Sequence, residues 1–173
     1  MTKYIIIGVL ILSVGFLYVG KGISGDATQQ AADLWSSLQG DKYQETWALW
    51  PGKGKLYKGT HPHGALLTTY TNETTAAALA EGVKELPKGS VIVKENYMPG
   101  AKLAAITVMD KTGDGKDDWF WVKYMPDGTV AKKEVEKDGK KMKVTLAGTP
   151  KGCVQCHAAS VGKVHNIMTP LPK

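Results

Sequence analysis

The sequence predicts an α+β fold, with helices first, an antiparallel meander β-sheet in the middle, and a short helical segment at the C-terminal end. Between residues 65 and 146, segments rich in Val, Ile, Thr and aromatic residues follow one another with short turns between them. Strands joined in this way pair antiparallel. The segment before them has the apolar spacing of a helix. With 173 residues, 43% of them hydrophobic, the chain suffices for one domain with a real core.

Each element follows from a local signal. Apolar spacing predicts helices over residues 26–38 and 43–50, and Pro51-Gly52 ends the second. Residues 53–61 are expected to form a loop. Asn72 is well placed to cap a helix over 73–83, because its side-chain oxygen can accept a hydrogen bond from the first turn. Strands are expected over residues 65–71, 90–97, 102–110, 119–124, 129–136 and 141–146, the last two as a hairpin around Asp138-Gly139.

The N-terminal segment predicts export. Lys3 precedes seventeen uncharged residues, 4–20, and Lys21 follows them. A short positive region before an apolar stretch is typical of a secretory signal. As a helix the stretch would be about 26 Å long, a little shorter than the apolar layer of a bilayer. Residues 1–25 are therefore expected to be a signal peptide or an N-terminal membrane anchor, and residues 26–173 a periplasmic domain, either soluble or tethered.

The charge pattern argues against a nucleic-acid partner. All 22 basic residues are lysine, whereas proteins that read bases or clamp phosphates normally use some arginine. The formal net charge of +6 includes Lys3 and Lys21, so the rest of the chain carries +4. Its lysines are scattered among acids, as over residues 132–143, which is typical of a solvated surface. The acidic loop over residues 110–118 lacks the spacing of an EF-hand, and no calcium site is predicted there.

One motif carries chemistry: Cys153-Val154-Gln155-Cys156-His157 is a C-x-x-C-H sequence. Two thiols at this spacing can add to the two vinyl groups of a haem, and the adjacent histidine then reaches the iron. A thioredoxin-like redox pair should instead follow an early strand of a βαβ unit. A zinc site would need a second pair of ligands, which the other three histidines do not offer at the usual spacing. The motif therefore predicts one covalently attached haem c, and it makes the C-terminal helical segment the expected haem-binding segment.

The late position of the motif narrows the class of cytochrome. Small electron carriers place it near the start of the chain, whereas only sixteen residues follow His157 here. The helical-bundle cytochromes c′ carry it late, but they should show four long helices before it. In its order of motifs the sequence resembles the cytochrome P460 family, which includes the sheet-rich cytochromes c′-β. The resemblance covers residues 49–157 and rests on residues 62–64, 70–72, 87–95, 108–111, 118–121 and the C-x-x-C-H motif.

The resemblance implies roles for five residues. Cys153 and Cys156 match the thioether anchors, and His157 matches the proximal ligand of the iron. Lys94 falls where cytochromes P460 have a lysine bonded to the porphyrin, which requires a neutral amine. In a strand Lys94 shares its face with the residues at 92 and 96, so this face would line the haem; the alternative is an ordinary lysine that points to water. His63 stands where the c′-β members have an apolar cap, and we expect it in the distal pocket as a hydrogen-bond donor or a sixth ligand; the alternative is a loop histidine bonded to backbone.

The sequence also departs from the family. The members that oxidise hydroxylamine resemble one another in a distal carboxylate shortly before the haem motif, but residues 144–150 contain no acid. Glu95, Glu134 and Glu136 are the candidate substitutes, none of them at a matching spacing. Trp35, Trp47 and Trp50 are expected to pack helices onto the sheet.

Three functions are carried forward. The first is oxidation of hydroxylamine or a related small nitrogen compound at the haem iron, with electrons passed to another cytochrome. The second is binding of nitric oxide or another diatomic gas, and the third is simple electron transfer. Whether the protein is an enzyme stays open among them. Homodimers are common among proteins of this resemblance.

Overall fold

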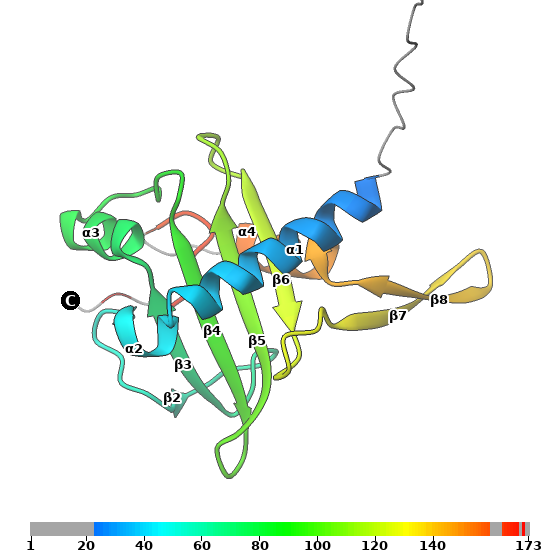
Figure 1. Ribbon diagram of the computed structural model, residues 1–173, viewed down its shortest axis with the longest axis horizontal. Coiled ribbons are helices and arrows are strands. Elements are labelled where there is room, and N and C mark those ends of the chain that lie inside the picture. The colour runs from blue at the N-terminus through cyan, green and yellow to red at the C-terminus, as the bar shows by residue number, and fades with distance from the viewer. Residues whose placement is uncertain (1–22, 160–163, 170, 172–173) are drawn as a thin grey trace, which may run out of the picture.

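The computed structural model describes residues 23–159, 164–169 and 171 (Figure 1). The expected signal peptide or anchor falls almost entirely on residues 1–22, which lie outside the described residues, so export stays a prediction. Among the residues described, no helix is both long and apolar enough to span a membrane. The fold is α+β with an antiparallel sheet, as the sequence predicts.

The main sheet is built around four strands that pair in chain order, which confirms the central meander. They are β3 (Leu66–Thr71), β4 (Val91–Met98), β5 (Lys102–Lys111) and β6 (Trp119–Tyr124). Three two-residue strands extend it: β1 (Ala48–Leu49) and β2 (Tyr57–Lys58), which both pair with β3, and β9 (Ala147–Gly148), which pairs with β6.

Three segments differ from the sequence-based prediction. The helix expected over residues 43–50 ends early as α2 (Tyr43–Thr46), because the chain then becomes extended and pairs with β3. The loop expected over residues 53–61 contains β2. The last hairpin, β7 (Lys132–Lys137) and β8 (Lys140–Thr145), forms a separate two-stranded sheet that projects from the body (Figure 1). Its apolar side chains are few: Met142 and Val144 share one face of β8, and both stay exposed instead of packing against the main sheet.

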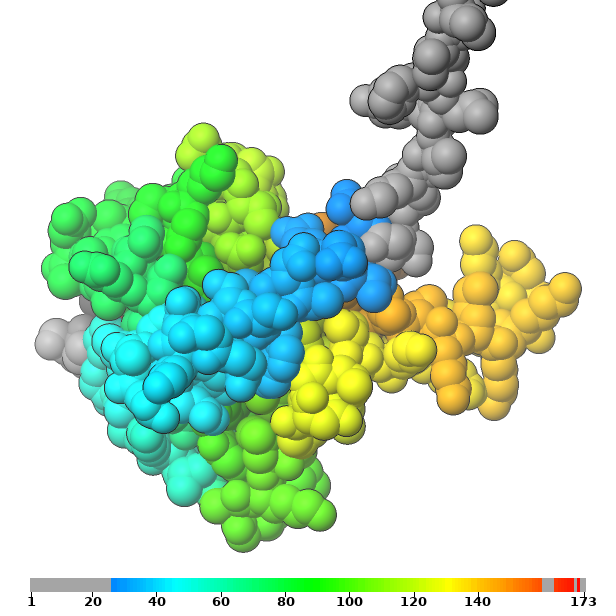
Figure 2. Space-filling view, viewed as in Figure 1, coloured from blue at the N-terminus to red at the C-terminus, as the bar shows by residue number. Residues whose placement is uncertain are grey.

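The helices lie on opposite faces of the main sheet. The first face is covered by α1 (Ile23–Gly40) together with α2 (Figures 1 and 2). The helix α3 (Glu73–Glu81) begins as predicted, since the Asn72 side chain accepts a hydrogen bond from the Thr75 N–H at 3.1 Å. The C-x-x-C-H motif lies on α4 (Lys151–Ala158), behind the sheet in Figure 1.

Two buried clusters result, one on each face of the sheet. The first packs the helices α1 and α2 against Tyr70, Val93 and Phe120. The second contains Trp50, Ile92 and residues from α3, β5, β6 and the C-terminal segment, and Cys153 packs against it. Because side chains alternate along a strand, neighbouring residues of β4 contribute to different clusters. The second face is the one that α4 and the C-terminal segment cover.

Candidate functional site

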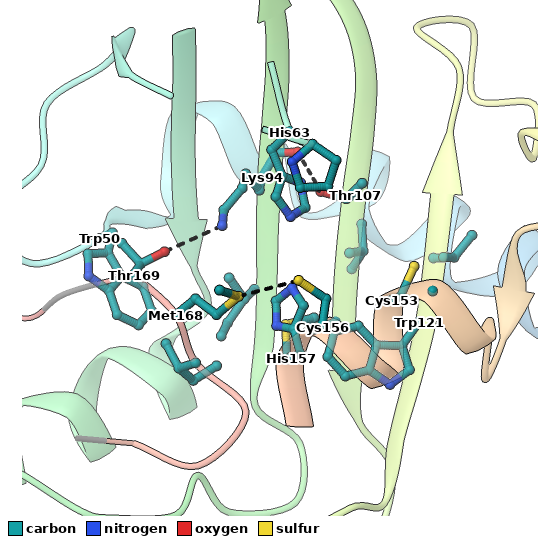
Figure 3. A pocket seen from close by; sticks show the side chains of 17 residues that line it. Trp50, His63, Lys94, Thr107, Trp121, Cys153, Cys156, His157, Met168 and Thr169 are labelled. Carbon is teal, nitrogen blue, oxygen red and sulfur yellow. Dashed lines mark hydrogen bonds between the residues drawn. The ribbon is translucent and has the colours of Figure 1, made fainter. Parts of the chain in front are cut away.

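A pocket lies between the second face of the sheet, α4 and the segment after α4 (Figure 3). It consists of a cavity of about 130 Å³ and an adjoining one of about 240 Å³. Both are lined by the same central side chains: Pro62, His63, Lys94, Cys156, His157, Met168 and Thr169. Most of the remaining wall of the smaller cavity is apolar, and no aspartate or glutamate is among the described residues that line either cavity.

The geometry of α4 brings the motif to this pocket. Residues three and four apart on a helix share a face, so Cys153, Cys156 and His157 all line the same cavity. Both cysteines are free thiols; Cys153 is half-buried and Cys156 is exposed. Burial raises the pKa of the Cys153 thiol. The two thiols and the imidazole are therefore presented together at one wall, which is where the sequence predicts the haem attachment site.

His157 is held in a defined tautomer. Its side chain is buried, with 8% exposed, and its Nδ1 lies 2.8 Å from the Asn166 carbonyl oxygen. A carbonyl can only accept a hydrogen bond, so Nδ1 carries the proton and Nε2 keeps its lone pair. Trp121 packs against the ring at 4.7 Å between centroids. Burial lowers the pKa of His157, which favours the neutral form that a metal ligand requires.

The Asn166 carbonyl is itself fixed from a distant loop. The Asp117 carboxylate lies 2.9 Å from His165 Nε2 and accepts a hydrogen bond from Asn166 Nδ2 at 3.3 Å. Asn166 Nδ2 also donates to the Lys116 carbonyl at 3.3 Å. These contacts tie the C-terminal segment to the loop between β5 and β6, and they set the position of the carbonyl that orients His157.

His63 lies in the pocket opposite His157, with 6.0 Å between the ring centroids and 88° between the ring planes (Figure 3). Its Nδ1 is 3.1 Å from Asn96 Oδ1. The amide nitrogen of Asn96 donates to the Lys94 and Ala105 carbonyls, so Oδ1 is the atom that faces His63. His63 therefore also carries its proton on Nδ1. Burial, followed by the nearby charge of Lys94, lowers the pKa of His63 to about 4.

Lys94 points into the same pocket from β4, as the alternation of the strand predicts. Its Nζ donates to Thr169 Oγ1 over a long 3.4 Å (Figure 3). Burial lowers the pKa of Lys94 to about 8. The side chain is thus not an ordinary strand lysine that points to water.

None of the three glutamates considered as a distal carboxylate reaches the pocket. Glu95 is the neighbour of Lys94 on β4 and faces the other side of the sheet, where it accepts hydrogen bonds from Tyr43 at 3.0 Å, from Tyr97 at 2.6 Å and from Gln44. Glu134 and Glu136 are on the projecting hairpin. These candidate substitutes are therefore wrong.

Several residues of the site are not among those singled out from the sequence. Trp50 is 1% exposed and lies in one buried cluster with residues of α3 and of the sheet, as expected, but it also lines the pocket, which was not expected. Asn96 and Asn166 fix the two imidazoles, and Asp117 fixes Asn166. Asn96 shares a strand face with Lys94, which is a signal for its place in the pocket. The partners of Asn166 and Asp117 are distant in sequence, and no local pattern marks them.

Comparison with known proteins gives the chain no family: no family model matches it, and no curated protein is found to match it. Within the described ranges, no group of three or more His, Cys, Asp or Glu side chains is placed to hold a metal ion.

Proposed function

We propose that the protein is an exported monohaem c-type cytochrome of the cytochrome P460 type. In this proposal it oxidises hydroxylamine or a related small nitrogen compound at the haem iron and passes the electrons to another cytochrome. One observation carries it: both thiols of the C-x-x-C-H motif, the free Nε2 of His157 and the amine of Lys94 converge on one apolar pocket.

The residues present fit a covalently bound haem. A thioether forms when a thiol adds across a vinyl group, with the sulfur bonding one carbon and the proton going to the other, so no oxidant is needed. Cys153 and Cys156 offer two such thiols on one face of α4. Trp50, Ile92 and Trp121 give the apolar wall that a macrocycle requires. When bound, the haem supplies an iron that changes oxidation state and binds small ligands.

The chain's own residues have separable roles in this proposal. His157 is the proximal ligand, and its hydrogen bond to the Asn166 carbonyl fixes the ring and raises the basicity of Nε2. Burial lowers the pKa of Lys94 to about 8, so about a tenth of its amine is neutral at pH 7 and about half at pH 8. A neutral amine is the form that a bond to the porphyrin needs, and it can also exchange a proton with a bound substrate.

A second candidate function is reversible binding of nitric oxide or another diatomic gas. The acid-free lining of the described pocket favours it. A positioned general base contributes roughly 10²–10⁴-fold to a reaction that moves protons, and oxidation of hydroxylamine requires such transfers. Binding of a diatomic gas requires none, so an apolar pocket without a carboxylate suits it.

The first experiment is expression in a host that attaches haem c, followed by the pyridine haemochrome spectrum of the denatured protein. We expect one covalent haem per chain, and none in the variant Cys153→Ala/Cys156→Ala. A wild-type protein without covalent haem would refute the proposal.

Turnover then separates the two candidates. Reduction of an acceptor cytochrome that depends on hydroxylamine supports the enzyme, and Lys94→Ala should lower it while Lys151→Ala, which changes an exposed lysine of α4, should not. Tight nitric oxide binding without turnover supports the second candidate.

A further inference from the structure

We infer that His63 is the second axial ligand of the haem iron in the resting protein, and that a small molecule reacts at the iron only after His63 has left it. The inference rests on the proposed function, because it needs a haem held by His157. It adds a form of regulation to that site, because His63 would occupy the position on the iron at which a small molecule reacts.

The separation of the two histidines is the first argument. A ring nitrogen binds a transition metal at about 2 Å, and the ring centroid lies roughly 1 Å behind that nitrogen. Two imidazoles on opposite sides of one metal ion therefore have centroids about 6 Å apart. The centroids of His63 and His157 are 6.0 Å apart. They come from opposite walls of the pocket, one from the loop before β3 and the other from α4 (Figure 3).

The hydrogen bonds give the second argument, because 6.0 Å also suits two rings in edge contact. Both Nδ1 atoms are engaged away from the partner ring, His63 with Asn96 and His157 with the Asn166 carbonyl. Each Nε2 is then an acceptor, and among the described residues neither has a hydrogen-bond donor. Among the described residues, the buried polar side-chain atoms without a partner are Ser90 Oγ and Trp119 Nε1, so neither imidazole Nε2 is sealed from the open space of the pocket and both lone pairs stay available to a metal ion. One metal ion between them satisfies both lone pairs.

The third argument is that His63 is held in place although it lies outside the strands. Its backbone N–H donates to the Thr60 carbonyl at 3.1 Å, and the Ala65 N–H donates to the Tyr97 carbonyl at 2.9 Å. Between them, Gly64 has φ 127°, and a Cβ there would lie 2.8 Å from the Tyr97 carbonyl oxygen. The chain is therefore pressed against β4 beside His63. Metal-binding histidines usually hold their other ring nitrogen in a hydrogen bond, and Asn96 Oδ1 supplies that bond to His63 Nδ1.

A closed iron lowers the apparent affinity for any external ligand. The apparent dissociation constant is the intrinsic one divided by the fraction of molecules in which the position is open. If His63 is off the iron in about 1% of molecules, the affinity falls about 100-fold. The substrate or gas must then compete with His63, and a condition that loosens residues 60–65 would activate the protein.

The test uses the intact haem protein, and its haem content is measured first. A protein without covalent haem fails the proposed function and not this inference alone. With haem present, we expect the optical and electron paramagnetic resonance spectra of the ferric wild type to be low-spin. His63→Gly should be high-spin, and added imidazole should restore the low-spin spectrum. The apparent affinity of the ferrous protein for carbon monoxide should rise at least about 10-fold in His63→Gly.

Matched variants keep the test decisive if His63→Gly folds poorly. His61→Ala changes an exposed histidine two residues away that lines the larger cavity, and it should leave the spectra as in the wild type; a low-spin spectrum lost in this variant and kept in His63→Gly would overturn the inference. Asn96→Ala keeps His63 and removes the partner of its Nδ1, so the affinity for carbon monoxide should rise moderately. A high-spin ferric wild type would overturn the inference. So would a low-spin spectrum that survives in His63→Gly without imidazole and is lost in Met168→Leu, Met109→Leu or Lys94→Met, which change other pocket side chains that offer a ligand atom.

Discussion

Lys94 gives a quantitative test of how much a charge in the pocket lowers the stability of the folded protein. Burial lowers its pKa from 10.5 to about 8. One pKa unit corresponds to about 1.4 kcal/mol, so the charged form of Lys94 costs the folded state about 3 kcal/mol at neutral pH. The variant Lys94→Met keeps the length of the side chain and removes the charge. In a background that cannot attach haem, Cys153→Ser/Cys156→Ser, we expect Lys94→Met to raise the free energy of unfolding by up to this amount.

The pH dependence follows from the sign of the shift. Between about pH 8 and pH 10.5 the unfolded chain keeps the proton on Lys94 and the folded chain has lost it. The unfolded state then binds more protons, so stability rises with pH in this window. Below about pH 8 the penalty is present in full. The advantage of Lys94→Met should therefore be largest near neutral pH and shrink as the pH approaches 10.

The assay is urea unfolding followed by tryptophan fluorescence, with both proteins measured at several pH values between about 7 and 9.5. Comparing the pair removes the contribution of the buried tyrosines, which are common to both. Lys102→Met, at an exposed position of β5, is the matched control. Its free energy of unfolding should change with pH in the same way as that of its parent. If the free energy of unfolding of Lys94→Met also changes with pH in the same way as that of its parent over the whole window, burial does not disfavour the charged amine and the reasoning is wrong.

Three further predictions concern the support of the site. Gly64→Ala should cost about 2–4 kcal/mol of stability in thermal or urea unfolding, because φ is 127° and the new Cβ meets the Tyr97 carbonyl; Gly54→Ala, with nothing within 4 Å, should cost far less. Asp117→Ala should raise the midpoint potential of the bound haem in a redox titration, because a looser Asn166 carbonyl makes His157 less basic. Tyr43→Phe should cost about 1–3 kcal/mol in urea unfolding, because it removes a donor from the buried Glu95 carboxylate.

Regular strands with strong composition are predictable from the sequence because their signal is local. The strands β3 to β6 lie close to the expected ranges, and Asn72 caps α3 as expected. The sequence does not predict the short strands β1 and β2, because a two-residue segment becomes a strand only when it pairs with another strand. Here both segments pair with β3. The hairpin β7–β8 was expected in the meander. The pairing of its two strands is predictable from the sequence. Its separation from the main sheet is not, because that depends on which side chains are buried against the main sheet.

The candidate site divides in the same way. Cys153, Cys156 and His157 share a helix face through their spacing alone, and the alternation of β4 assigns Lys94 to a face. Which face of the sheet becomes the pocket depends on where α4 packs, and that is a tertiary property. The contact of Asp117 with Asn166 joins residues 49 positions apart. No sequence pattern around Asp117 or around Asn166 predicts this contact.

Adjacent residues of β4 show why burial of charge is informative here. Lys94 and Glu95 are neighbours of opposite charge, yet the pleat sends them to opposite faces, so they do not pair across the sheet. On the first face, Glu95 is 1% exposed and receives hydrogen bonds from Tyr43, Gln44 and Tyr97. A carboxylate satisfied in this way is expected in a structural core.

On the other face, the contact between Lys94 and Thr169 at 3.4 Å is long, and burial lowers the amine's pKa. A partly buried cation with so little support costs stability, and perturbed groups of this kind cluster at functional sites. Two neighbouring residues of β4 therefore carry charges in opposite situations, one well satisfied by hydrogen bonds and one poorly supported. Glu95, a candidate for the distal carboxylate in the sequence analysis, is part of the core, and the poorly supported Lys94 lies where two thiols and two imidazoles converge.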